Sequence, residues 1–153
     1  MKLLRLLPLL LAFAAAVQAQ NGDLAIIAHK DVPVDNLTFA EVRKLFRGER
    51  QFWASNQRVI LLVRAPVAHE RDIVLRRIYQ MTEAQYRQYW ISKVFRADIA
   101  SGPKLVYSDG MTTELVGNIP GSVGFVAASK VPPGFKVLKV DGLKPGDKGY
   151  PLR

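Results

Sequence analysis

The sequence predicts a single α/β domain with a mixed, mostly parallel sheet flanked by helices. Short continuous apolar runs are typical of buried strands, and segments with helical spacing alternate with them along the chain. No internal repeat, low-complexity tract or change of composition marks a second domain. Strands that alternate with helices favour an α/β layer whose sheet is at least partly parallel.

Five segments have the composition of strands. They are residues 24–28, 58–63, 105–107, 122–126 and 135–140. The first two are apolar almost throughout, which predicts that both faces are buried. Gly121 before the fourth strand predicts a tight turn, because glycine permits unusual backbone dihedral angles. The tail after residue 140 is rich in Gly, Pro and Lys and lacks periodicity, which predicts irregular structure.

Capping residues and apolar spacing predict four helices between these strands. Residues 38–41 and 82–85 form capping boxes, in which side chains at the helix start bind free backbone N–H groups. Gly48 is expected to end the first helix, a basic helix runs over about residues 68–80, and the last begins at residues 108–109. The side chains expected to face the core are Phe39, Val42, Leu45, Phe46, Ile73, Val74, Ile78, Tyr86, Tyr89, Trp90, Val94, Met111, Leu115 and Val116.

The first nineteen residues have the pattern of an export signal. Lys2 and Arg5 precede the apolar stretch of residues 6–17, and Ala19 is a suitable last residue before cleavage. The stretch is shorter than the roughly 20 apolar residues that span a bilayer, which disfavours the alternative of an N-terminal membrane anchor. With no Cys at the junction, a lipoprotein is excluded. We therefore expect a periplasmic protein whose mature domain is residues 20–153, with no stable membrane span after cleavage.

Composition narrows the partners and the chemistry. The mature part keeps 20 Lys and Arg against 13 Asp and Glu, a net charge of +7, which steers anions toward the surface. Export disfavours nucleic acid as a partner and leaves a small anion, an acidic protein or the membrane surface. The alternative is a basic surface that serves solubility alone. The absence of Cys excludes disulfides and thiolate metal sites.

Residues for catalysis are scarce. His29 and His69 are 40 positions apart and fit no metal-binding spacing, and His29 is expected to be a structural residue. The segment 121–124 lacks the glycine–serine–glycine spacing of a nucleophile elbow. We therefore expect no enzyme activity, no cofactor and no metal; the alternative is a hydrolase.

Arg64, His69 and Arg71 form the candidate anion-binding site. Arg64 lies at the carboxyl end of a predicted strand, in the loop that leads to a helix. Ligands of open α/β sheets bind outside the carboxyl ends of the strands, and helix N-termini offer free N–H donors to oxyanions. The alternative is that these basic residues are simply solvated. Asp109, at the next helix start, is expected to cap that helix and to repel an anion.

The order of several segments resembles the periplasmic phosphate-binding proteins, the substrate-binding components of phosphate ABC transporters. The segments are Asn36–Gly48 followed by Trp53, then Val63–Arg64, Tyr89–Trp90, Pro120–Val126 and Tyr150–Leu152. The resemblance spans nearly the whole mature chain. It implies a periplasmic-binding-protein-like fold and a phosphate ligand.

Two departures from this family bear on function. The family folds as two lobes around phosphate, whereas this chain has the length of one lobe. After the family's arginine an acidic residue and serine–glycine–threonine follow, whereas here Pro66 and residues 68–70, Ala-His-Glu, take those positions. Losing two charge-assisted hydrogen bonds costs roughly 3–6 kcal/mol. We therefore predict an exported solute-binding-like domain that binds phosphate or another oxyanion weakly. The alternative is an envelope adaptor that docks a membrane transporter or sensor and takes no small ligand.

Overall fold

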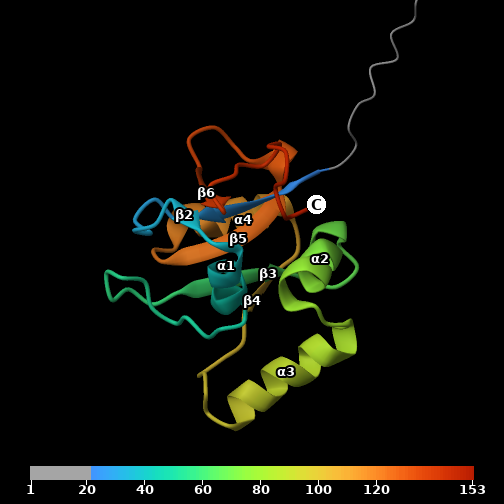
Figure 1. Cartoon of the computed structure of the whole chain (residues 1–153). Coiled ribbons are helices and arrows are strands. Elements are labelled where there is room, and N and C mark those ends of the chain that lie inside the picture. The colour runs from blue at the N-terminus through green and yellow to red at the C-terminus, as the bar shows by residue number, and fades with distance from the viewer. Residues whose placement is uncertain (1–21) are drawn as a thin grey trace, which may run out of the picture.

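The computed structural model of the protein describes residues 22–153, and the expected signal peptide of residues 1–19 lies outside the described residues. Six strands form one sheet in the order β2-β6-β1-β5-β3-β4 (Figure 1). The strands are β1 (Leu24–Ala28), β2 (Asn36–Leu37), β3 (Ile60–Arg64), β4 (Lys104–Val106), β5 (Ser122–Ala127) and β6 (Lys136–Val140). The five predicted strands are confirmed within two residues at each end, and the two-residue β2 was not predicted.

The sheet is mostly parallel, as predicted. β1 is antiparallel to both of its neighbours, β5 and β6. The pairs β2–β6, β3–β4 and β3–β5 are parallel. The carboxyl ends of β3, β4 and β5 therefore meet at one edge of the sheet.

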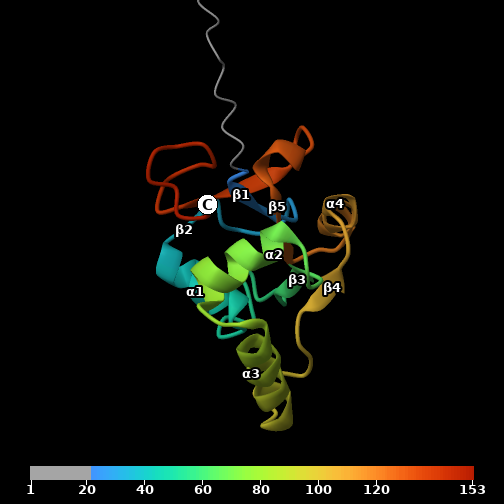
Figure 2. The same ribbon diagram turned by 90° about the vertical axis from the view of Figure 1, so that its right-hand side faces the viewer.

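Helices cover both faces of the sheet. One core cluster packs α1 (Phe39–Phe46), α2 (His69–Val74) and α3 (Glu83–Phe95) against one face. A smaller cluster packs α4 (Asp109–Asn118) against the other face. Figure 2 shows this order, with α4 on one side of the strands and α1 and α2 on the other. The predicted α/β architecture is confirmed.

Local sequence signals set the helix starts. The Thr38 and Thr82 hydroxyls each accept a hydrogen bond from the backbone N–H three residues on. In turn, the side chains of Glu41 and Gln85 accept from the backbone N–H of the cap residue. Both capping boxes are therefore confirmed. Ser108 caps α4 by accepting from the Met111 N–H at 2.9 Å.

The basic helix predicted over residues 68–80 divides in two. α2 ends at Val74 and continues as a π-helix, η1 (Leu75–Tyr79), which ends at Gln80 in a left-handed conformation. Leu75, Ile78 and Tyr79 are buried in the core. The apolar spacing predicted a continuous α-helix, because a spacing of 3.6 residues per turn gives no sign of a π-helical turn.

One core prediction in α3 is wrong. Val94 is 43% exposed, and it lies beside Ile91 and Phe95, which are 56% and 89% exposed. Tyr86 and Trp90 are buried as predicted. In Figures 1 and 2, α3 extends away from the sheet at one end of the molecule, so only one stripe of the helix reaches the core. Within residues 22–153, no helix combines the length and apolarity needed to cross a membrane.

Candidate anion-binding site

Arg64 is the last residue of β3 and begins the loop that leads to α2. The loop is tied to the neighbouring strand, since the Ala65 N–H donates to the Val106 carbonyl at 2.9 Å. Arg71, one turn into α2, donates to the Arg64 carbonyl at 2.7 Å. Strand pairing and helix packing therefore fix the backbone of Arg64 at the carboxyl edge of the sheet.

The Arg64 guanidinium is partly neutralised within the protein. Its side chain is 14% exposed, and Nη1 donates to Asp109 Oδ1 at 2.7 Å. Glu70 lies farther away, with Oε2 4.0 Å from Arg64 Nη2. Arg64 Nε is buried and has no hydrogen-bond partner within residues 22–153. The site therefore combines a compensated charge with one unsatisfied donor.

Asp109 has a different role from the one predicted for it. Ser108 caps α4, and the carboxylate of Asp109, the first residue of α4, accepts a hydrogen bond from Arg64 at the end of β3. Burial raises the pKa of Asp109, the negative charge of Glu70 adds to that rise, and the charge of Arg64 opposes it. The charged form of Asp109 is thus less stable, relative to its protonated form, than that of an ordinary aspartate.

Arg71 is held in a separate ion pair. It is 3% exposed, and its Nε and Nη2 donate to the two carboxylate oxygens of Glu83 at 2.6 and 2.8 Å. Its guanidinium also lies 4.6 Å from the centroid of the Tyr86 ring. The hydrogen bond to Glu83 raises the pKa of Arg71. Each of its three nitrogens therefore donates, two to this carboxylate and one to the Arg64 carbonyl.

The Arg71–Glu83 pair predicts a stability difference that depends on pH. The hydrogen bond from Arg71 lowers the pKa of Glu83 below its ordinary 4.5. Because the folded-state pKa is lowered, the contribution of the pair is complete above the unfolded-state pKa and is lost as pH falls through the folded-state pKa. We expect Glu83→Gln to be less stable than the wild type at pH 7. In urea unfolding from pH 7 to pH 3, this gap should narrow below about pH 4.5, and a gap that stays constant would contradict the assignment.

His69, the third predicted ligand, is the first residue of α2 and is exposed. Ala68 precedes it as the N-cap and offers no side-chain hydrogen bond. Before them, Val67 has a φ of 77° and a side chain that is 96% exposed. A β-branched residue at positive φ is strained by an amount on the order of 1–3 kcal/mol, and such strain clusters at binding sites and switch regions.

The structure thus separates the three predicted ligands. Arg64 and His69 flank the strained loop, whereas Arg71 supports that loop from inside. No group of three or more potential metal ligands gathers within residues 22–153. His29 is buried, and its Nδ1 accepts from the Asp31 N–H at 3.2 Å, consistent with the structural role predicted for it.

Comparison with solved structures gives relatives of the fold. The chain is similar to an ABC-type phosphate transport receptor from Vibrio cholerae, with 21% identity and a TM-score of 0.66 over 80% of this chain and 48% of that one. PstS from Borrelia burgdorferi gives 19% identity and a TM-score of 0.66 over 85% and 53%. A third structure is assigned as a phosphate ABC transporter substrate-binding protein, with bound phosphate, from Clostridium perfringens. It gives 18% identity and a TM-score of 0.65 over 80% and 46%.

No protein-family model matches the chain, and no curated protein matches it significantly. The chain spans about half the length of the solved proteins to which it is similar. The similarity noted in the sequence therefore extends to the three-dimensional fold. The protein has the fold of about half of a phosphate ABC transporter substrate-binding protein.

Proposed function

We propose that the protein is an exported, non-catalytic, solute-binding-like module that binds phosphate or another small oxyanion weakly at Arg64. Three features support the proposal. The fold is shared with phosphate substrate-binding proteins, one of them solved with bound phosphate. The net positive charge favours anions. Arg64 lies at the carboxyl edge of a parallel part of the sheet, where α/β proteins bind ligands.

The observation that carries the proposal is the unsatisfied Arg64 Nε–H. A buried donor without a partner costs about 1–3 kcal/mol. An oxyanion beside the guanidinium would accept from it and would add charge-assisted bonds. The strained backbone of Val67 in the same loop also supports a binding site here, because such strain clusters at functional sites.

Two carboxylates limit the affinity. An anion at Arg64 must compete with Asp109 at 2.7 Å and approach Glu70 at 4.0 Å. Arg71 contributes little attraction for an anion, since Glu83 neutralises its positive charge. We assign Arg71 as a positioning residue, which fixes the loop through the Arg64 carbonyl, and His69 as an exposed second donor. Weak binding follows from this charge balance.

We expect calorimetric titration of residues 20–153 with phosphate at low salt to give a dissociation constant in the millimolar range. Arg64→Ala should weaken binding at least tenfold, because the guanidinium proposed to bind the anion is lost. Arg76→Ala is the matched control: it removes the same charge from an exposed position on η1. Equal losses in the two variants would mean that phosphate responds to net charge and would contradict a site at Arg64.

The exposed face of α3 favours a second candidate function, docking of an envelope protein. Ile91, Val94 and Phe95 lie on one side of this helix and are 43–89% exposed. Titrations that stay flat for phosphate and sulfate in both wild type and Arg64→Ala would favour this interaction module over the oxyanion receptor.

A further inference from the structure

A cavity of about 110 Å³ lies at the opposite edge of the sheet from Arg64. It is lined by Ile60 and Leu61 at the amino end of β3 and by Lys104 at the amino end of β4. At about 3.3 Å per residue, β3 separates this cavity from Arg64 by roughly 13 Å. The cavity is therefore independent of the site proposed above.

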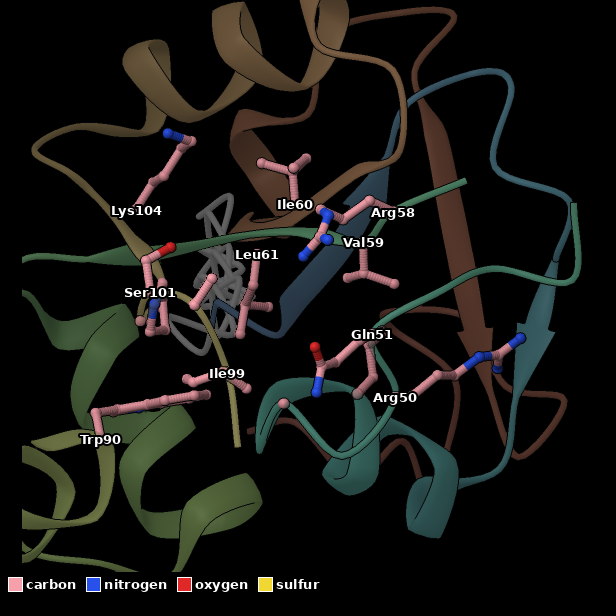
Figure 3. A pocket seen from close by; sticks show the side chains of 15 residues that line it. Arg50, Gln51, Arg58, Val59, Ile60, Leu61, Trp90, Ile99, Ser101 and Lys104 are labelled. Carbon is pink, nitrogen blue, oxygen red and sulfur yellow. The ribbon is translucent and has the colours of Figure 1, made fainter. Parts of the chain in front are cut away.

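One wall is polar and is held by backbone hydrogen bonds. The Val59 N–H donates to the Gln51 carbonyl at 2.9 Å, and Phe52 and Arg58 form an antiparallel bridge. This loop returns on itself and places the side chains of Gln51 and Arg58 on the same wall (Figure 3). The Arg58 backbone packs closely against Gly121, since a Cβ on Gly121 would lie 2.3 Å from the Arg58 carbonyl oxygen. The polar wall is therefore positioned before any ligand arrives.

The other wall is apolar. Leu61, Ile99 and Trp90 line it, and the last two are at most 9% exposed. Trp90 is held between two glycines: a Cβ on Gly48 would lie 2.9 Å from its ring, and one on Gly102 would lie 3.9 Å from its Cβ. An apolar cavity of about 150 Å³ binds benzene in another protein. The space here suits a compact apolar group of that kind, part of which stays at the mouth.

The charge around the cavity is positive. The lining contains Arg50, Arg58 and Lys104 and no Asp or Glu. None of these three cations forms an ion pair in the part of the chain that the structure describes. In Figure 3, Arg58 extends over the cavity, whereas Arg50 and Lys104 point away from it. The Arg58 guanidinium lies 5.3 Å from the centroid of the exposed Phe52 ring, and this cation–π contact helps to hold the guanidinium at the mouth of the cavity.

We propose that this cavity binds a small carboxylate that carries a compact apolar or aromatic group. The carboxylate accepts two parallel hydrogen bonds from the Arg58 guanidinium, whose fork matches its geometry. The apolar group packs against Leu61, Ile99 and Trp90. Inorganic phosphate lacks that group and gains nothing from the apolar wall, so the two sites select different anions.

Benzoate is the probe for this site, and benzyl alcohol is its uncharged counterpart of similar size. We expect saturable benzoate binding by calorimetry, with amide shifts in NMR spectra at Leu61, Ser101 and Gly102. Benzyl alcohol should bind at least tenfold more weakly. Arg58→Gln should weaken benzoate at least tenfold, whereas Arg64→Ala and the exposed control Arg76→Gln should change it less than twofold.

A second variant tests the cavity without touching the charge. Ser101→Leu narrows the space from the loop before β4, and we expect it to abolish the benzoate-induced shift at Leu61. The proposal is overturned if benzoate does not saturate, if benzyl alcohol binds equally well, or if Arg58→Gln binds benzoate like the wild type. Loss in Arg64→Ala but not in Arg58→Gln would assign benzoate to the loop before α2 and would also overturn it.

Discussion

Asp109→Asn is expected to raise the affinity for phosphate by roughly ten- to hundredfold at pH 7. Asn keeps the shape of the side chain and removes the charge that binds Arg64 at 2.7 Å. A charge-assisted hydrogen bond is worth about 1.5–3 kcal/mol, and each 1.4 kcal/mol is about tenfold in a binding constant. The anion then takes the place of the carboxylate on the guanidinium. Calorimetric titration at low salt measures the change.

Glu114→Gln is the matched control for this prediction. It removes one negative charge from the same helix at an exposed position, and Glu114 forms no ion pair within residues 22–153. We expect its affinity for phosphate to stay within twofold of the wild type. If Asp109→Asn has no effect, or if both variants gain equally, the Arg64–Asp109 pair does not control binding.

Gly121→Ala is expected to lower the free energy of unfolding by about 3 kcal/mol or more. Two effects add in this variant. Gly121 has a φ of 80°, where a side chain costs roughly 1–2 kcal/mol. The new Cβ would also lie 2.3 Å from the Arg58 carbonyl oxygen, so the backbone must move. The Gly121 carbonyl accepts from the Trp53 indole at 2.9 Å, and that movement disturbs a buried hydrogen bond as well.

Gly134→Ala separates the two effects. Gly134 has nearly the same φ, 81°, and nothing lies within 4 Å of the Cβ that would be added. Urea unfolding should therefore show a loss of about 1–2 kcal/mol at this position. Equal losses at Gly121 and Gly134 would show that the clash with Arg58 is relieved without cost. Gly121→Ala should also weaken benzoate, because it displaces the backbone of Arg58.

Sequence predicts best where the signal is local. The capping boxes of Thr38 and Thr82 each involve residues three positions apart, and both are present. The position of Arg64 at the end of a strand was also predictable from the apolar run before it. The orientation of α3 was not: Val94 has helical spacing from Trp90, but α3 extends beyond the sheet and leaves Val94 uncovered.

The electrostatics of the site could not be predicted from local pattern. Arg64 and Asp109 are 45 positions apart and meet only because β3 and β4 are parallel neighbours whose carboxyl ends coincide. The pairing of Arg71 with Glu83 was equally hidden, since Glu83 comes from a different helix. Asp109 lies two residues after a predicted strand, and Arg64 directly follows another; these two opposite charges near strand ends were the available signal.

The cavity near Arg58 had no signal in the sequence. Its walls come from the end of α1, the loop before β3, α3 and the loop before β4. No spacing or motif connects these residues. The close approach of the Trp90 ring to the end of α1 depends on Gly48, where an added Cβ would lie 2.9 Å from the ring.

Residue-resolved NMR titration of the wild type with phosphate tests the central claim, that Arg64 and its loop receive an oxyanion, most directly. The account predicts saturable shifts of the Val67, His69 and Glu70 amides and of the Arg64 Nε–H, with none at Leu61 and Gly102. Shifts spread evenly over exposed Lys and Arg residues, or none in residues 64–70 at tens of millimolar phosphate, would contradict it.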